Sequence, residues 1–205
     1  MTDTIGRKSE TAWHNEQLPA YMMNTHFPHI KNSDHFPAIK QCFSHIGEAK
    51  NLIDLGCGKA EISDVFTEYE YCGADLPHMI QKVSRLSKPT LKYVEFDVYL
   101  SDMNFISEFD IVLMNSFLSE IPNANQILDK VLKHSKRHVV IHRQIIENQE
   151  NIVTYSTYGS LPTIAYTFDR KEFEDIVHQN SFKKLVDINT FPSVPNTKTI
   201  LLQRM

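Results

Sequence analysis

The sequence predicts an α/β fold built on a doubly wound sheet of seven strands, mostly parallel, with an antiparallel last strand. From Asn51 onward, short apolar runs alternate with helical patterns, and this alternation implies right-handed crossovers between parallel strands. The two closing strands are joined only by "PSVPN", residues 192–196. That connection is too short for a parallel crossover, so the last strand should run antiparallel to its neighbour. The length of 205 residues fits one such domain with a short appendage.

The expected elements follow one another regularly along the chain. Short apolar or β-branched runs predict strands at 51–55, 69–76, 91–98, 109–116, 137–146, 182–191 and 198–205. Helical spacing of apolar residues predicts helices at 60–69, 77–87, 102–108, 123–135 and 169–181. The stretch between the fifth strand and the last helix is expected to be irregular.

The first 45 residues differ from the rest, with five histidines, three prolines and no strong strand pattern. Their apolar groups, among them Trp13, Tyr21 and Phe36, must be buried somewhere, and the mouth above the carboxyl edge of the sheet is the place the fold leaves open. We therefore expect residues 1–45 to form a helical lid and residues 46–205 to form the main domain.

Composition excludes several classes of protein. A net charge of −4 and a pI of about 6.2 argue against a general nucleic-acid binder. The N-terminus lacks a signal-peptide core, and no run approaches the ~20 apolar residues of a membrane span. The three cysteines form no CxxC pair, as expected in a reducing compartment. These features predict a cytoplasmic protein that binds neither nucleic acid nor membrane.

The stretch "NLIDLGCGKA", residues 51–60, carries the first functional signal. A buried strand ends at Asp54 and Leu55, and the turn that follows has glycines at 56 and 58 on either side of Cys57. Such glycines permit positive φ and let a ligand approach the backbone. Asp75, about twenty residues further on, ends the second strand, where an acid can bind ribose hydroxyls. Ala60 stands where the dinucleotide fingerprint has its third glycine, which weakens an NAD interpretation.

Together these motifs resemble the class I S-adenosylmethionine-dependent methyltransferases. The resemblance implies that Asp54, Gly56, Cys57 and Gly58 surround the methionine part of the cofactor and that Asp75 binds its ribose. It further implies that Leu76 packs on the adenine, that Asp97 with Val98 lies at the adenine amino group, and that Asn115 and Ser116 line the cofactor's edge. Taken singly, Asp54 and Asp97 could equally be helix or loop caps, and Cys57 is better explained as a small apolar filler than as a nucleophile.

Two alternatives stay open beside the methyltransferase. An NAD(P)-dependent oxidoreductase would need a catalytic Tyr-Lys or equivalent pair after the fourth strand, and "NSFLSEIP" offers none. A catalytically silent methyltransferase-like subunit would bind the cofactor or a partner only.

The second half, residues 139–177, weakly resembles putative methyltransferases of surface-polysaccharide and other small-molecule pathways. This resemblance favours a small hydroxylated acceptor and O-methylation, for which a general base is expected. His142, at the end of the fifth strand, is the first candidate for that base, and Arg143 could bind an acidic group of the acceptor. His26 and His29 are rivals from the predicted lid. Aromatic residues expected in the acceptor pocket are Tyr21, Tyr155, Tyr158 and Tyr166. The histidines at 26, 29 and 35 have no carboxylate or cysteine cluster to complete a metal site, so none is predicted.

Overall fold

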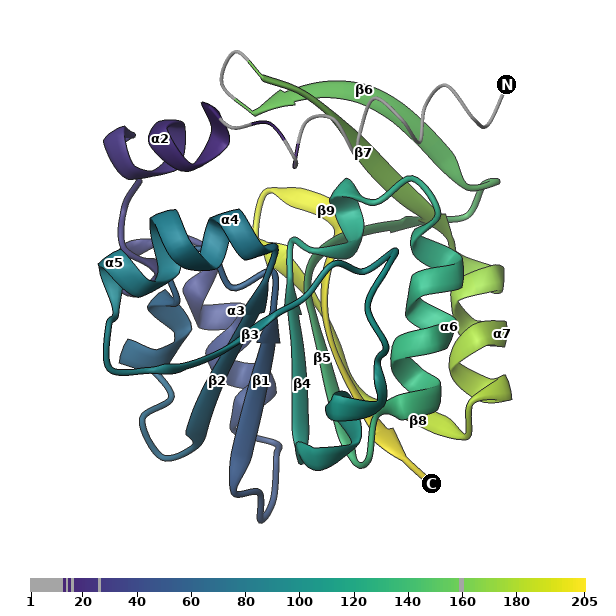
Figure 1. The fold of residues 1–205 in the computed structure, drawn as a ribbon. Coiled ribbons are helices and arrows are strands. Elements are labelled where there is room, and N and C mark those ends of the chain that lie inside the picture. The colour runs from purple at the N-terminus through teal and green to yellow at the C-terminus, as the bar shows by residue number, and fades with distance from the viewer. Residues whose placement is uncertain (1–12, 14, 16, 26, 159–160) are drawn as a thin grey trace.

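A computed structural model describes residues 13, 15, 17–25, 27–158 and 161–205. In this part of the chain, nine strands form one twisted sheet (Figure 1). The strands are β1 (Asn51–Leu55), β2 (Glu70–Asp75), β3 (Lys92–Glu95), β4 (Ile111–Asn115), β5 (His138–Glu147), β6 (Ile152–Tyr158), β7 (Leu161–Asp169), β8 (Phe182–Phe191) and β9 (Val194–Arg204).

The strand order is β3-β2-β1-β4-β5-β7-β6, and β9 pairs with both β5 and β8. The first five strands are parallel, whereas β9 runs antiparallel to β5 and β8. This arrangement confirms the predicted fold class and the antiparallel last strand. The chain winds outward from β1 in one direction and from β4 in the other, so the carboxyl ends of β1 and β4 flank the switch point where open α/β sheets bind ligands.

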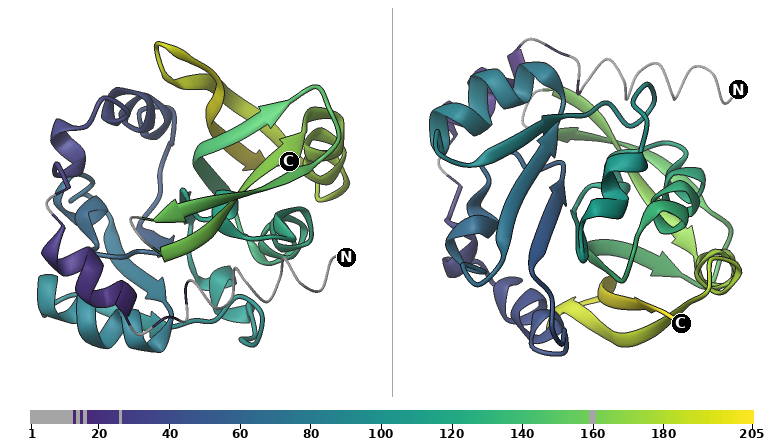
Figure 2. Two further views of the ribbon diagram at one scale, coloured as in Figure 1. Left: turned by 90° about the horizontal axis from the view of Figure 1, so that it is seen from above. Right: turned by 60° about the horizontal axis from the view of Figure 1, so that its bottom comes forward.

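Helices cover both faces of the sheet (Figure 2). They are α2 (Gln17–Asn24), α3 (Phe36–Phe43), α4 (Pro77–Met79), α5 (Arg85–Ser87), α6 (Ala124–His134) and α7 (Arg170–Gln179). A π-helical turn at Ile80–Ser84 joins α4 to α5. Short 3₁₀ turns lie at Ile30–Asn32, Glu61–Asp64, Asn104–Glu108 and Leu118–Glu120. No helix among these described residues is both long and apolar enough to cross a lipid bilayer.

Period-two burial along the strands divides the core between the two faces. Ile53, Val112 and Val139 pack beneath α6 and α7. Their neighbours Leu52, Ile111 and Val140 pack on the opposite face, with α3. The apolar stripe of α6 (Ile127, Leu128, Val131 and Leu132) is fully buried, as its helical spacing predicts.

Three sequence expectations about local structure were wrong. The stretch expected to be irregular contains the hairpin β6–β7, which raises the strand count from seven to nine. The helix expected at 60–69 is only the 3₁₀ turn Glu61–Asp64, which follows Ala60 in the left-handed conformation. Beyond it, Phe66 stacks on Phe43 with ring centroids 3.7 Å apart. The segment 102–108 likewise forms a 3₁₀ turn in place of an α-helix.

The predicted lid divides into two parts. Helix α2 lies above the carboxyl ends of the strands, across from the β6–β7 hairpin (Figures 1 and 2). Helix α3 instead buries Ile39, Cys42 and Phe43 in the sheet's core and is part of the main domain's helical layer. A lid function therefore stays a prediction only for residues up to 25, and of these the structure describes 13, 15 and 17–25.

Candidate functional site

The glycine turn after β1 adopts the backbone that its sequence predicts. Gly56 has φ 74° and Gly58 has φ 49°, both in the left-handed region. A Cβ at Gly56 would lie 2.8 Å from Cδ2 of Phe117, so only glycine fits there without movement of that ring. Ala60, at the position of the dinucleotide motif's third glycine, also has positive φ, at 57°.

Asp75 links this turn to the end of β2. Its Oδ2 accepts a hydrogen bond from the backbone N–H of Gly58 at 2.9 Å, and its Oδ1 accepts one from that of Leu76 at 2.8 Å. Burial raises the pKa of Asp75 to about 6, although the two backbone donors lower it. The carboxylate thus fixes the turn while it lines a cavity at the strand ends.

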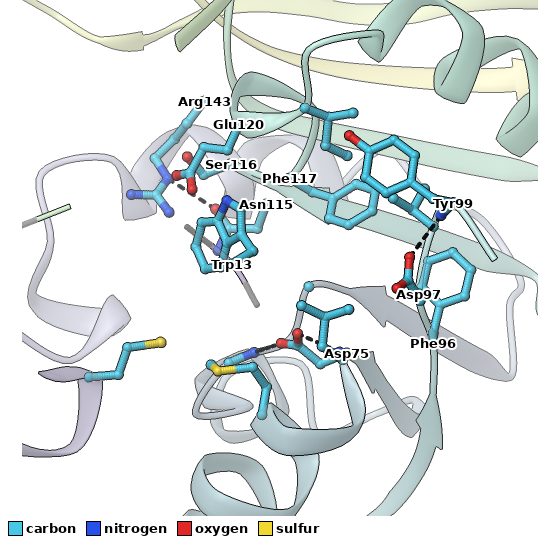
Figure 3. A pocket seen from close by; sticks show the side chains of 17 residues that line it. Trp13, Asp75, Phe96, Asp97, Tyr99, Asn115, Ser116, Phe117, Glu120 and Arg143 are labelled. Atoms are coloured by element: carbon cyan, nitrogen blue, oxygen red, sulfur yellow. Dashed lines mark hydrogen bonds between the residues drawn. The ribbon is translucent and has the colours of Figure 1, made fainter. Parts of the chain in front are cut away.

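Two cavities adjoin at this edge of the sheet. The smaller one has a volume of about 190 Å³ and lies at the ends of the first four strands, beside Arg143 of β5. Figure 3 shows Asp75 on one side of it and Asp97, with Phe96 and Tyr99, on another. The Oδ1 of Asp97 accepts a hydrogen bond from the backbone N–H of Tyr99 at 2.9 Å, which closes the loop after β3. Leu76, Val98 and Phe117 add apolar side chains to the lining of this cavity.

Two strained residues form the next part of the wall. Ser116 has φ 57° and Arg143 has φ 62°, a conformation that costs L-residues other than glycine about 1–2 kcal/mol. They are neighbours, because the N–H of Ser116 donates to the carbonyl of His142 at 2.9 Å. Arg143 stands where the pairing of β5 with β9 shifts register between His142 and Gln144. The irregularity turns its guanidinium toward the cavity, where Nε donates to Oδ1 of Asn115 at 3.0 Å (Figure 3).

A larger cavity of about 650 Å³ adjoins the smaller one. The two share seven lining residues: Met22, Gly56, Gly58, Asn115, Ser116, Glu120 and Arg143. Beyond this shared wall, the lining of the larger cavity combines apolar residues, such as Phe27, Ile30 and Ile62, with polar and charged groups that include Asp34, His35, Lys59 and Glu61. Burial raises the pKa of Glu120 to about 8, while the nearby Arg143 lowers it.

Asp54 lies beneath the glycine turn and lines the larger cavity. Tyr71 donates its hydroxyl hydrogen to Oδ2 at 2.9 Å, whereas Oδ1 is buried and accepts no hydrogen bond from any described residue. Burial raises the pKa of Asp54 to about 7, and the neighbouring charge of Asp75 adds to the shift. A buried carboxylate oxygen that accepts no hydrogen bond destabilises the folded protein. A bound ligand with an N–H or O–H group could donate the missing hydrogen bond to Oδ1 of Asp54.

Comparison with known proteins decides the family. The sequence profile of a family described as "Methyltransferase domain" matches residues 28–186. The chain belongs to this family. It is therefore an S-adenosylmethionine-dependent methyltransferase, as the motifs after β1, β2 and β3 predict, and not an NAD(P)-dependent oxidoreductase. No curated protein matches the sequence significantly.

Solved structures show the same fold at low sequence identity. The methyltransferase resembles the 1,6-didemethyltoxoflavin-N1-methyltransferase of Burkholderia thailandensis, with a TM-score of 0.67 and 12% identity over 98% of this chain and 90% of that one. It also resembles the magnesium protoporphyrin IX methyltransferase of Synechocystis PCC 6803 with bound S-adenosylmethionine, with a TM-score of 0.65 and 11% identity over 100% and 98%. A third is an amino pentose methyltransferase from Micromonospora echinaspora, with a TM-score of 0.61 and 13% identity over 89% and 99%.

The residues predicted to hold the cofactor meet at the two cavities. Gly56, Gly58, Asp75, Leu76, Asp97, Val98, Asn115 and Ser116 line the smaller one, and Asp54 and Cys57 line the larger one. The Cys57 thiol lies 3.6 Å from Oγ of Ser84, and burial raises its pKa well above the usual range. It is therefore protonated and packs as a small apolar group, in keeping with its interpretation as a filler.

Of the predicted catalytic residues that the structure describes, only Arg143 lines the cavities. Arg143 lines both cavities. His142 is 1% exposed and lines neither, because its side chain lies under His35. His29 is also outside both: its Nε2 is 3.0 Å from Oδ2 of Asp64, and its Nδ1 accepts from the N–H of Lys31. His26 lies outside the described residues.

The predicted aromatic lining of the acceptor pocket differs from the structure. Tyr166 is 2% exposed and lies in the core beside Phe168, since β7 buries alternate side chains. Tyr155 is 61% exposed on β6. Tyr21 packs edge-on against Phe27, with ring centroids 6.4 Å apart, and does not line either cavity. The side chain of Tyr158 lies outside the described part of the chain.

Sequence reasoning missed several lining residues, above all Glu120, Phe117 and His35. Glu120 and Phe117 follow β4 in the stretch "NSFLSEIP", of which only Asn115 and Ser116 were predicted to line the site. An acid two residues before a proline in a loop after a buried strand was a usable signal. His35 precedes "FPAIKQCF", and nothing in the local pattern distinguishes it from the other histidines of that segment.

Proposed function

We propose that this methyltransferase transfers the methyl group of S-adenosylmethionine to an oxygen of a small, polar, hydroxylated molecule. The observation that carries the proposal is the shared wall of the two cavities. On one side is a narrow space bounded by carboxylates and apolar side chains, and on the other a roomier space whose lining includes charged groups of both signs. A cofactor that spans the shared wall would present its methyl group to an acceptor in the larger cavity.

The residues present fit this cofactor. Asp75 would bind the ribose hydroxyls, and Leu76, Val98 and Asp97 would contact the adenine from the far end of the smaller cavity. The left-handed glycines leave space beside the backbone for the methionine part. The unused Oδ1 of Asp54 is a suitable acceptor for an ammonium hydrogen. When bound, the cofactor supplies an activated methyl group, and alignment of the acceptor accounts for much of the rate.

The lining of the larger cavity supports a polar acceptor. It contains carboxylates at Asp34 and Glu61, the cation Lys59, and Arg143 at the shared wall. Charges of both signs suit a molecule with several hydroxyl, amine or acid groups better than an apolar one. Methyltransferases of similar fold act on an amino pentose, 1,6-didemethyltoxoflavin and magnesium protoporphyrin IX according to their names, so the fold is compatible with small acceptors.

A radiolabel assay tests the proposal. Purified protein is incubated with S-adenosylmethionine labelled in the methyl group and with matched pairs of small molecules that differ by one hydroxyl, such as sugars and their deoxy analogues. We expect label to pass to hydroxylated members and mass spectrometry to place it on oxygen. Transfer only to nitrogen would overturn O-methylation. Cofactor binding without transfer to any acceptor would instead support the silent subunit.

A further inference from the structure

A row of four polar side chains runs from the larger cavity into the protein interior. Nδ1 of His35 lies 2.9 Å from Nε2 of His142. Nδ1 of His142 lies 2.7 Å from Oγ1 of Thr199, which in turn lies 2.8 Å from Oγ1 of Thr190. Of these four residues only His35 lines the cavity, and the other three are at most 2% exposed.

The fold holds His35 firmly at the head of this row. The residue directly precedes α3, whose Ile39, Cys42 and Phe43 are buried in the core. Its ring is tilted against that of His142, with centroids 5.0 Å apart, and stands edge-on to Phe191 at 5.9 Å. Because Nδ1 faces His142, Nε2 is the nitrogen left for a ligand, and no hydrogen bond joins it to another residue in the described part of the chain.

The row has two consistent sets of proton positions. A neutral histidine carries one N–H, so the short contact between the two rings requires one nitrogen to donate and the other to accept. If His35 donates from Nδ1, His142 accepts at Nε2 and donates from Nδ1 to Thr199. In that arrangement Nε2 of His35 presents a lone pair to the cavity. In the reverse arrangement, Nε2 of His35 carries the hydrogen and acts as a donor. The hydroxyls of Thr199 and Thr190 therefore help to decide whether Nε2 of His35 donates or accepts a hydrogen bond.

We propose that Nε2 of His35 accepts the acceptor's hydroxyl proton during methyl transfer, and that His142 is the positioning residue that orients it. The acceptor oxygen forms its bond to the methyl carbon as the carbon–sulfur bond breaks, and that electron pair passes to sulfur. The hydroxyl proton passes to Nε2, and the imidazolium of His35 donates from Nδ1 to His142. This inference rests on the proposed function. The sequence predicts His142 as the general base, whereas the inference assigns that role to His35.

The charges around His35 support this role. Burial and, to a smaller extent, Arg143 lower the pKa of His35 to about 4, while Asp34 opposes both. Burial, Arg143 and His35 hold the pKa of His142 well below its usual range. Both rings are therefore neutral at neutral pH, and a lone pair is available. Methyl transfer removes the positive charge of the sulfonium at the moment His35 gains one, so the pKa of His35 rises as the reaction proceeds.

Nuclear magnetic resonance of the full chain with ¹⁵N-labelled histidine tests the proposal without an acceptor. The ring nitrogens are titrated from about pH 3 to about pH 8, a range that extends below the lowered pKa of His35, with S-adenosylmethionine bound and again with S-adenosylhomocysteine bound. We expect the pKa of His35 to be at least about half a unit higher in the S-adenosylhomocysteine complex, because that ligand lacks the sulfonium charge. His35→Gln assigns the signal, and His29, which lines neither cavity, is the internal control and should not shift.

Two further variants test the positioning role of His142. Thr199→Val removes the hydroxyl that contacts Nδ1 of His142, and we expect it to change the proton distribution on both rings of the pair. Thr197→Val, on the same strand but outside the row, is the matched control and should leave both rings as they are. Unchanged His35 signals in Thr199→Val would overturn the role of His142.

The outcomes separate this inference from the proposed function. Binding of both ligands with an identical pKa of His35 would overturn the assignment of His35 alone. Failure of both ligands to bind, measured by calorimetry on the same samples, would contradict the proposed function and with it this inference.

Discussion

The two cavities that meet at the glycine turn are built in different ways. The smaller one is bounded mainly by residues at the carboxyl ends of consecutive strands, from Gly56 after β1 to Asn115 at the end of β4. The larger one adds residues 27–35, which precede the sheet altogether, and meets them with the turn after β1. One cavity is a direct product of the sheet's topology, and the other depends on how a separate segment packs above it.

This difference explains how the two sides divide the chemistry. Parallel strands bring their carboxyl ends to one edge, so the cofactor side is fixed once the sheet forms. The acceptor side can change with its segments while the sheet stays the same. The strained backbone of Ser116 and Arg143 lies where the two sides join, as strain often does at functional sites.

Loss of Asp75 should have the largest effect on the cofactor side. Asp75→Ala removes a charged acceptor from the ribose and frees the N–H of Gly58, so we expect S-adenosylhomocysteine to bind more weakly by about 2 kcal/mol or more. Calorimetry measures the affinity, and Asp175→Ala on the surface of α7 is the control. A folded Asp75→Ala variant with wild-type affinity would remove Asp75 from the site.

The glycine turn offers a matched pair of substitutions. Gly56→Ala places a Cβ 2.8 Å from Phe117 in a left-handed conformation, and we expect a loss of stability of about 1–2 kcal/mol with weaker cofactor binding. Gly47→Ala meets nothing within 4 Å and should leave both quantities unchanged. Urea unfolding and calorimetry of the two variants check this. Equal behaviour of the pair would show that the turn tolerates a side chain.

Asp54 should make stability depend on pH. Its pKa is raised to about 7 in the folded state, so the folded protein holds a proton that the unfolded chain has released above pH ~4. The free energy of unfolding should therefore fall as pH rises from ~4 to ~7 and level off above that. The side chain in Asp54→Asn does not titrate. Between pH ~4 and ~7, we expect the free energy of unfolding of this variant to rise by about 1 kcal/mol or more relative to that of the wild type. A constant difference between the two proteins at all pH values would contradict the raised pKa.

Substitution of Tyr166 should have the smallest effect. It distinguishes the core position seen in the structure from the place in the acceptor pocket that the sequence predicts. Its ring is buried in the core, outside both cavities, so Tyr166→Phe should cost no more than about 1 kcal/mol of stability. Cofactor affinity and methyl transfer should stay at wild-type levels. A specific loss of methyl transfer in this variant would return Tyr166 to the acceptor pocket.

The smaller cavity could be predicted from the sequence more completely than the larger one. The acids and glycines at 54–58, 75 and 97 could be located because each lies at or just after the end of a strand that the sequence predicts. The hairpin β6–β7 was missed although its runs alternate around "GS" at 159–160, a hairpin signal. The contact between His35 and His142 joins residues 107 positions apart, and no local pattern encodes such a pair. Strand-end chemistry is local in sequence, whereas the acceptor cavity depends on tertiary packing.

The most direct test of the account is a calorimetric titration of the wild-type protein with S-adenosylhomocysteine and, separately, with NAD⁺. The account predicts one-to-one binding of S-adenosylhomocysteine with a dissociation constant in the micromolar range or below, and no measurable heat with NAD⁺. Tighter binding of NAD⁺, or no binding of S-adenosylhomocysteine by folded protein, would contradict the assignment of the strand-end cavity to the methyl donor.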